Sequence, residues 1–306
     1  MLRFAAKRLL GAIPTLLLIV TLSFFLMRIA PGGPFDKERV VPPEIEARLI
    51  HAYHLDEPLP MQFLRYLGGL VQGDFGPSLK YKDFTVTELI AGGFPVSLRL
   101  GGIAVLLALI AGVAIGTLAA LRQNTTTDYA AMGAAMTGIM VPNFVLAPLL
   151  TLVFGLWLSW LPVGGWDGSV KYMILPVFAL SLYQVGFIAR LTRGSMIEVL
   201  RTNYVRTARA KGLPERVAIT RHALKAGMLP VVSYLGPAII NTITGSVIIE
   251  QIFGIPGIGR YFVQAALNRD YTLVMGVTVF YGVLIILANL AVDLIYGLLD
   301  PRIRYD

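Results

Sequence analysis

The sequence predicts an all-α protein that crosses a membrane several times. Only 14% of its 306 residues are charged, whereas a soluble globular chain carries about 25%, and 56% are hydrophobic. Long apolar stretches replace the missing charge, which also excludes a disordered chain. No stretch alternates with the two-residue period of a barrel strand, and a helix is the other structure that satisfies its backbone polar groups inside lipid.

Six segments are long and apolar enough to cross a hydrocarbon core about 30 Å thick, which takes roughly 20 helical residues. The expected spans are 9–29, 96–121, 132–157, 172–189, 228–249 and 273–299. The first is longer than the core of a secretory signal, which has about 7–15 residues, and no A-x-A cleavage pattern follows it. We therefore expect an uncleaved helix.

The basic residues set the orientation of these spans. Six spans place both termini on one side, together with the second and fourth connecting loops. That side carries three basic residues in the N-terminal tail, one in the second loop, nine in residues 190–227 and two at the C-terminus. The short loops opposite carry only Lys171, Arg260 and Arg269. Because basic residues gather on the cytoplasmic side, both termini are expected to be cytoplasmic.

Several kinds of chemistry lack the residues that they need. The chain has no cysteine, no G-x-x-x-x-G-K-[ST] phosphate loop, no G-x-S-x-G and no H-E-x-x-H. His51 and His54 could share a helical face, but a metal would also need Asp56 or Glu57, and nothing fixes either. We expect no catalytic residue, no cofactor site and no metal site in this chain.

The expected organisation is an N-terminal tail and first span (1–30), an extracytoplasmic loop (31–95) and a five-helix core (96–306). Within the loop, apolar residues at helical spacing predict short helices over 44–54 and 62–71. About 65 residues can form a small cap but hardly an independent domain. The loop is either a docking or gating surface outside the membrane or a lid over helix ends.

The cytoplasmic loop of residues 190–227 is the most informative segment. Residues 202–211 are expected to form a helix that ends at a C′ glycine, Gly212. Pro214 at the first position and Glu215 in the first turn then favour a second helix that continues into the fifth span. Nine cations lie along this elbow. A basic loop is often only the signal for orientation, but so compact an elbow favours a docking element.

Uncharged polar residues mark the spans more than ionisable ones do. Tyr234, Asn241 and Thr244 lie within about one stripe of the fifth span, with Thr242 and Ser246 beside it. Such a face either lines a wet cavity or joins helices by hydrogen bonds. Together with Asn143 and Gln184, the stripe is a candidate lining for a translocation path.

Carriers driven by an ion gradient usually bury ionisable groups near the bilayer midplane. The deep candidate here is Asp293, which lies near a helix end. The spans therefore hold few of the ionisable groups that an autonomous, gradient-driven carrier would need. A membrane-embedded enzyme would also need a nucleophile and a base, and the sequence shows no such arrangement. Uphill transport would take its energy from another subunit.

Residues 204–230 carry a motif known from one transporter family. They resemble the inner-membrane permease subunits of bacterial binding-protein-dependent ABC importers, whose motif is E-A-A-x3-G-x9-I-x-L-P. Gly212, Leu224 and Ala208 match the glycine, the leucine and the second alanine. The departures are Arg206 for Glu, Thr207 for Ala, His222 for Ile and Lys225 for Pro.

These departures resemble the peptide/nickel branch, which has T-A-R-A-K-G-L at this place. The turns at 27–32, 73–78 and 250–259 and the ending at 300–304 are also similar to that branch, and within it to oligopeptide permeases. The resemblance implies a type I ABC importer permease fold in a bacterial inner membrane. The implied substrate is an oligopeptide; dipeptide, glutathione and nickel permeases share the tract and remain alternatives.

The resemblance also implies partners: a homologous second permease, two ABC ATPase subunits that bind ATP and Mg²⁺, and an extracytoplasmic solute-binding protein. It assigns ATPase coupling to eight consecutive residues of the elbow. These are Arg206, Thr207, Ala208, Arg209, Ala210, Lys211, Gly212 and Leu213.

Overall fold

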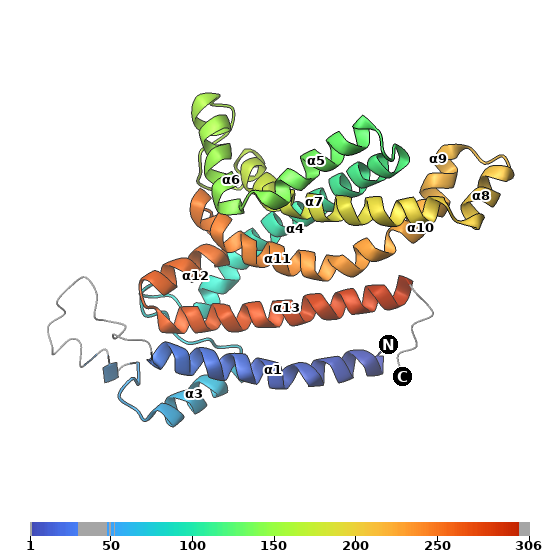
Figure 1. Cartoon of the computed structure of the whole chain (residues 1–306). Helices are drawn as coiled ribbons and strands as arrows, with labels where there is room; N and C mark the ends of the chain where they lie inside the picture. The colour runs from blue at the N-terminus through green and yellow to red at the C-terminus, as the bar shows by residue number, and fades with distance from the viewer. Residues whose placement is uncertain (1, 30–47, 49, 52, 300–306) are drawn as a thin grey trace. The chain divides into compact units, whose positions relative to one another are not determined.

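The computed structural model describes residues 2–29, 48, 50–51 and 53–299, and in this part the chain is helical (Figure 1). The described residues contain no strand, only one isolated bridge between Pro77 and Thr85. The main helices, in chain order, are α1 (Leu2–Ile29), α3 (Leu59–Val71), α4 (Val86–Leu121), α5 (Thr126–Met140), α6 (Asn143–Leu150), η1 (Thr151–Trp157), α7 (Lys171–Leu200), α8 (Asn203–Ala210), α9 (Glu215–Val217), η2 (Ala218–Ala223), α10 (Leu224–Gly227), α11 (Leu229–Phe253), α12 (Ile258–Leu267) and α13 (Tyr271–Leu299).

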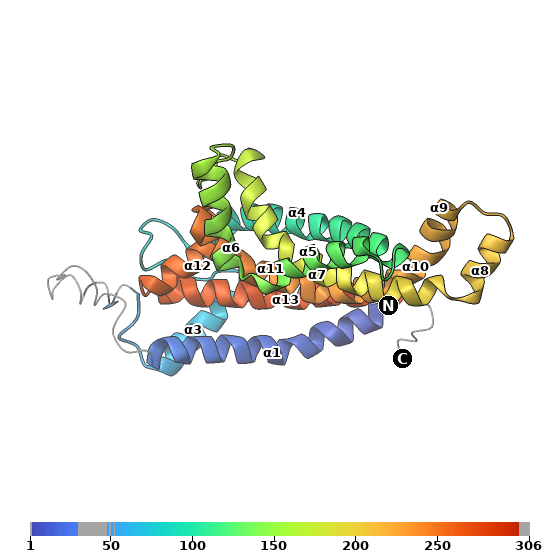
Figure 2. The ribbon, with the colours of Figure 1, turned by 45° about the horizontal axis from the view of Figure 1, so that its top comes forward.

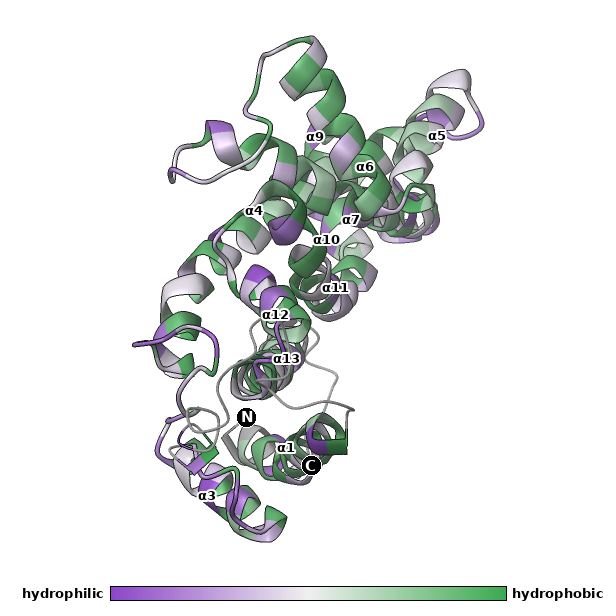
Figure 3. Ribbon diagram, turned by 90° about the vertical axis from the view of Figure 1, so that its left-hand side faces the viewer, coloured by the Kyte–Doolittle hydropathy of each residue, from purple (hydrophilic) through white to green (hydrophobic). Residues whose placement is uncertain are grey.

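Five of these helices, α1, α4, α7, α11 and α13, are long and apolar enough to cross a membrane. They confirm five of the six predicted spans, and apolar residues predominate along them (Figure 3). α4 begins ten residues before the predicted span, at Val86, where Thr85 and Glu88 form a reciprocal capping box. The backbone N–H of Thr85 donates to Glu88 Oε2 (2.8 Å), and that of Glu88 donates to Thr85 Oγ1 (3.2 Å).

The third predicted span is not a single helix, which corrects the prediction for 132–157. α5 ends at Met140, and the pair formed by α6 and η1 leaves it at an angle of 105°. Pro142 explains the break, because a residue before proline is pushed out of the helical region, and Val141 has φ −91° and ψ 115°. The chain has six spans only if this bent pair counts as one.

The helices gather into two compact units. One unit comprises Ser97–Ile255 and the chain from Ala288, and in it α7 packs against both α5 and α11. Glycines allow the close approach. A Cβ at Gly112 of α4 would lie 2.7 Å from the Cβ of Ile188 on α7, and Gly116 also faces α7. A Cβ at Gly186 of α7 would lie 2.5 Å from the carbonyl oxygen of Ala135 on α5. Such small residues are typical of helix contacts in membranes.

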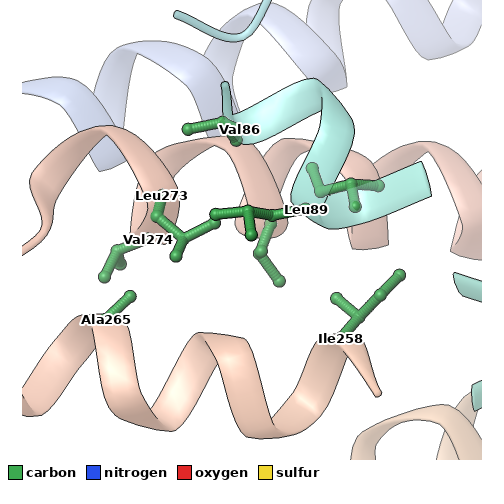
Figure 4. Close-up of a cluster of buried hydrophobic side chains, with 8 residues drawn as sticks. Val86, Leu89, Ile258, Ala265, Leu273 and Val274 are labelled. Atoms are coloured by element: carbon green, nitrogen blue, oxygen red, sulfur yellow. The ribbon is translucent and has the colours of Figure 1, made fainter. Parts of the chain in front are cut away.

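The other unit comprises Leu2–Val96 and Pro256–Leu287. Its core lies where the start of α4, the short helix α12 and the start of α13 meet (Figure 4). The cluster consists of Val86, Leu89, Ile90, Ile258, Ala265, Leu273, Val274 and Val277. α1 runs beside α13 in Figures 1 and 2, and a Cβ at Gly282 would lie 3.2 Å from Ile19.

A buried carboxylate ties the outer loop to α13 within this unit. Asp270 is only 1% exposed and accepts hydrogen bonds from the Ser78 hydroxyl (2.5 Å), the Lys80 backbone (3.2 Å) and the Leu273 backbone (3.1 Å). It thereby caps α13 and fixes the segment before α4. In the loop, α3 confirms the helix predicted at 62–71. The helix predicted at 44–54 lies largely outside the described residues.

Candidate coupling site and translocation surface

The first helix of the cytoplasmic loop forms as predicted. α8 covers Asn203–Ala210, so it begins one residue after the predicted start. Thr202 stands at its N-cap position. Val205 and Ala208 are buried, whereas Arg206, Thr207 and the residues after Ala208 are exposed. α8 is therefore a short amphipathic helix, with one face seated on the protein and the other open.

Gly212 ends this helix with the geometry of a Schellman motif. The N–H of Leu213 donates to the carbonyl of Ala208 (3.4 Å), and the N–H of Gly212 donates to that of Arg209 (2.9 Å). Gly212 has φ +76°, a left-handed conformation that glycine adopts without strain. The predicted C′ glycine is confirmed. A Cβ at Gly212 would meet nothing within 4 Å, so the constraint is the backbone conformation and not crowding within the chain.

The second helix differs slightly from its prediction. Pro214 occupies the N-cap position instead of the first helical position, and α9 begins at Glu215. The helix then passes through η2, a π-helical segment, into α10, and a break at Met228 precedes α11. We call residues 202–223, which comprise α8, the turn, α9 and η2, the coupling elbow.

An ion pair closes the elbow across its turn. Arg209 donates from Nη2 to Glu215 Oε1 (2.6 Å) and from Nε to Oε2 (3.0 Å), in a two-pronged arrangement. The Arg209 guanidinium holds the pKa of Glu215 below its ordinary value. Both side chains are largely exposed, so the pair fixes geometry more than it adds stability.

The base of the elbow is packed onto the ends of α4 and α7. Val205 of α8 and Ala223 of η2 are fully buried together with Met196 of α7 and Ala120 of α4. At Gly227 the returning chain lies so close to α7 that a Cβ would come within 2.7 Å of Met196 Sδ. The elbow is therefore in direct contact with α7 and continues through α10 into α11.

The open face of the elbow is strongly basic. It carries five cations and one acid, and the acid, Glu215, already pairs with Arg209. Arg206 and Lys211 project from the exposed side. Of the eight residues for which we expect ATPase coupling, seven are exposed, and Ala208 alone is buried. Ala208 therefore seats the helix, and the other seven are open to a partner.

One strong interaction beside the elbow was not predicted. Asp128, in the first turn of α5, is 1% exposed and accepts from Arg193 of α7 at both oxygens (2.6 and 2.7 Å). The backbone N–H of Asn124 also donates to Asp128 (2.9 Å). This pair joins the start of the bent span to the helix that leads into the elbow. The pair takes one of the nine cations of 190–227 out of the open surface.

The polar stripe of the fifth span divides between two faces of α11. Thr242 and Ser246 are buried, and their hydroxyls donate to carbonyls of their own helix. Asn241 and Thr244 are exposed. The exposed residues recur every three or four positions along α11: Pro230, Ser233, Pro237, Asn241, Thr244, Ile248 and Ile252. Asn241 and Thr244 thus lie on an open face, whereas Thr242 and Ser246 belong to the packed one.

Gln184 and Tyr234 act as a bridge between helices. The Tyr234 hydroxyl donates to Gln184 Oε1 (2.8 Å), and Gln184 Nε2 donates to the carbonyl of Ala238 (3.3 Å). The Tyr234 ring stacks on Phe187 of α7, with centroids 5.2 Å apart. Both polar groups of Gln184 are thus used in joining α7 to α11.

Asn143 stands at the bend of the third span. It is the first residue of α6, it is half-buried, and its Nδ2 would lie 3.5 Å from a Cβ at Gly245 of α11. Of the five residues proposed to line a path, Tyr234 contacts both Gln184 and the side chain of Asn241. Asn143 adjoins the middle of α11, and Asn241 and Thr244 are exposed.

The site offers cations, amides and hydroxyls. His54, exposed and at φ 55°, lies in a turn instead of on the helical face expected for it, and its Nδ1 lies 3.3 Å from Glu57. Within the part of the chain that the structure describes, no three His, Cys, Asp or Glu residues gather as a metal site would require. The arrangement is suited to receiving a protein partner at the elbow and to contacting a polar solute along α11.

These features define a helical membrane protein with several apolar spans and an exposed basic elbow. Residues 112–305 match the family model "binding-protein-dependent transport system inner membrane component", and residues 1–100 match the model of its N-terminal part. The chain belongs to this family. It is a multi-pass inner-membrane component of an ABC importer, a complex of several subunits, and its family is one of transport proteins and not of catalysts.

Individual relatives cover the whole chain. It is 58% identical over 306 residues to the oligopeptide transport system permease protein OppB of Salmonella typhimurium and 56% identical to that of Escherichia coli, with all of each chain covered. It is 46% identical to the dipeptide transport system permease protein DppB of Bacillus subtilis, with 99% of this chain and 98% of the relative covered. A crystal structure of an amino acid ABC transporter with histidines aligns at a TM-score of 0.53 and 18% identity. It covers 71% of this chain and 95% of that one, and it supports the fold alone.

Proposed function

We propose that this permease subunit forms half of a translocation pathway for oligopeptides and that separate ATPase subunits drive it through the coupling elbow. The observation that carries the proposal is the elbow itself. Its seven exposed coupling residues stand on a base packed into α4 and α7, so a push on them reaches the membrane helices. The sequence has no phosphate-binding loop, so ATP and Mg²⁺ would be held by the partner ATPases.

The charge of the elbow specifies the surface that receives it. Opposite charges across an interface speed association and exclude wrong partners. Because the elbow exposes cations and its one acid is already paired, the receiving groove on the ATPase should be acidic. Arg206 sharpens this expectation, since the general family motif has a glutamate there. A homologous second permease and an extracytoplasmic solute-binding protein would complete the complex.

The proposed substrate suits the open face of α11. Peptide bonds present one donor and one acceptor each, and the exposed Asn241 and Thr244 offer uncharged groups of both kinds. The high identity to relatives named as oligopeptide permeases supports the same substrate class. A dipeptide substrate is the second candidate, favoured by the 46% identity to a protein named as a dipeptide permease. Glutathione and nickel remain alternatives within the branch.

Reconstitution tests the proposal. Liposomes are prepared with the full chain alone, with its second permease and ATPases, and with the complete set including the binding protein. ATP-dependent uptake of a labelled tetrapeptide is expected only in the complete set, and competition by dipeptide, glutathione and nickel ranks the substrates. Uptake by the chain alone, driven by a proton or sodium gradient, would favour an autonomous carrier and contradict the proposal.

A further inference from the structure

A cavity of about 220 Å³ lies within the unit formed by 2–96 and 256–287, at the end of α1 that the charge asymmetry places outside. α1, α3, the turn before α4 and the start of α13 all contribute to its wall. Phe24 and Arg28 line it from α1, Gln62 and Tyr66 from α3, and Met275 from α13. None of the residues that line it belongs to the coupling elbow or to α11.

Three polar atoms at this cavity are buried without a hydrogen-bond partner among the described residues: Arg28 Nε, Tyr66 Oη and Gln62 Oε1. Gln62 is only 8% exposed, and its Nε2 already donates to the carbonyls of Leu55 (3.1 Å) and Glu57 (2.7 Å). Its Oε1 therefore has to accept. Leaving such buried groups without a partner destabilises the protein. A ligand that satisfies all three must accept at Arg28 and Tyr66 and donate at Gln62.

The charges around the cavity leave one cation available. Arg65 and His54 also line it, but both pair with Glu57, at 2.6 and 3.3 Å. Asp74 uses Oδ1 to accept from the backbone N–H of Gly76 (2.8 Å). Arg28 lies over the ring of Phe24, 5.2 Å from its centroid, and forms no ion pair with any residue that the structure describes. Arg28 is thus the described cation at the cavity that no acid pairs with, and because Asp74 keeps its own negative charge, a ligand would carry no more than one negative charge, placed at Arg28.

The surroundings of the cavity indicate that the ligand comes from the bilayer. Arg28 lies in the last turn of α1, about 20 helical residues from the basic N-terminal segment, which is the depth of a membrane interface. Beside it, Leu26 and Ile29 of α1 and Leu64 of α3 are more than 60% exposed. α3 packs on this end of α1, where Phe24 and Phe63 lie 5.2 Å apart. Such apolar neighbours suit acyl chains and not a free ion.

We propose that this cavity binds the headgroup of an anionic phospholipid with free hydroxyls, the chemistry of phosphatidylglycerol. The phosphodiester oxygens accept from Arg28 and Tyr66, a headgroup hydroxyl donates to Gln62 Oε1, and the acyl chains lie along the exposed apolar residues of α1 and α3. The bound lipid ties α1 to the outer loop at the membrane surface.

The test uses the full chain, first delipidated and then transferred to nanodiscs of phosphatidylcholine with a minor share of phosphatidylglycerol. Native mass spectrometry counts the phosphatidylglycerol that each chain retains. Arg28→Gln is expected to lower retention by about tenfold, the effect of losing one charge-assisted hydrogen bond. Lys82→Gln is the matched control, because it removes one exposed outer cation away from the cavity, and it should change nothing.

Tyr66→Phe removes only the hydroxyl and serves as the second variant, should Arg28→Gln fail to insert; it should also lower retention. Equal retention in both variants and the parent would overturn the proposal, and so would an equal loss in Lys82→Gln, which would mean that any outer cation suffices. Soluble sn-glycerol 3-phosphate should not displace the lipid. Displacement by it would assign the cavity to a free phosphate ester and overturn the lipid as occupant.

Discussion

Asp128 and Arg193, 65 residues apart in the sequence, form a two-pronged ion pair in which the carboxylate is almost fully buried. The pair joins the first turn of α5 to α7 seven residues before α7 ends. It lies next to the base of the coupling elbow, on the helix that would carry its motion. α7 is thus fixed to the bent span by charge as well as by the close approach at Gly186.

Removing one partner of this ion pair should destabilise the subunit strongly. Asp128→Ala leaves the guanidinium of Arg193 without its acceptor, and breaking a buried pair costs about 3–5 kcal/mol. The partial exposure of Arg193 places the effect near the lower end of that range. Thermal unfolding in detergent measures it. The exchanged double variant, Asp128→Arg with Arg193→Asp, should recover part of the loss, and the absence of any recovery would contradict a direct pairing.

Gly212→Asp should weaken binding of the ATPases without loss of membrane insertion. The substitution adds both a negative charge and the backbone strain of a side chain in a left-handed conformation. Gly212→Asn is the control, because asparagine has a similar side chain in that conformation but adds no charge. Co-purification of the ATPases should fall more for Asp than for Asn. Undiminished co-purification with the Asp variant would count against the assigned interface.

Arg206→Glu tests the expected acidic groove. Reversal of one exposed charge at an electrostatically complementary interface should slow association of the ATPases and weaken its dependence on salt. Arg221→Glu is the comparison, since it reverses an exposed cation of the elbow outside the eight coupling residues. Surface plasmon resonance at low and high salt separates the two variants. Faster association of Arg206→Glu would indicate a basic groove.

The ion pair across the elbow predicts how its rigidity depends on pH. Arg209 holds the pKa of Glu215 below its ordinary value, so the contribution of the pair is present above about pH 4.3 and is lost as pH falls through the lowered pKa. Protease resistance of the elbow should therefore be constant between about pH 6 and 8. Glu215→Gln should loosen the elbow between about pH 6 and 8 by about 0.2–1 kcal/mol, as for other exposed pairs, and the difference from the parent should shrink at acid pH. A steep change near neutral pH would point to a group other than Glu215.

Asn241→Leu should alter uptake while it leaves assembly intact, because Asn241 lies on the open face of α11. Thr242→Val is the matched control one position along. It removes a buried hydroxyl and should change stability more than uptake. Uptake assays and thermal unfolding of both variants distinguish the faces. Unchanged uptake of every tested peptide by Asn241→Leu would assign the stripe to packing.

The sequence predicted what depends on local chemistry. Gly212 was predictable because a left-handed stop after a helix has few alternatives to glycine, and five spans were predictable because an apolar stretch of membrane length is a strong signal. The bend at Val141 was missed although Pro142 was visible. The stretches on both sides of Pro142 are mostly apolar, so the hydropathy of the segment stays high. Hydropathy predicts burial in lipid, but it does not predict the direction of the backbone.

Other features depend on contacts between distant segments. Nothing near Asp128 in the sequence points to Arg193, and nothing near Gln184 points to the hydroxyl of Tyr234. Asn241 and Thr242 are adjacent and equally polar, so only the position of α7 against α11 separates an open residue from a packed one. The sequence alone therefore cannot tell which residues of the polar stripe line a wet cavity and which join helices.

The Schellman turn at Gly212 and the ion pair beyond it have a consequence for assembly. The two hydrogen bonds of that turn, the Arg209–Glu215 pair and the packing of Val205 against Met196 all lie within this chain and hold the elbow in its bent form. The docking proposed above would then cost little conformational entropy, because these contacts already order the segment that the ATPases would receive.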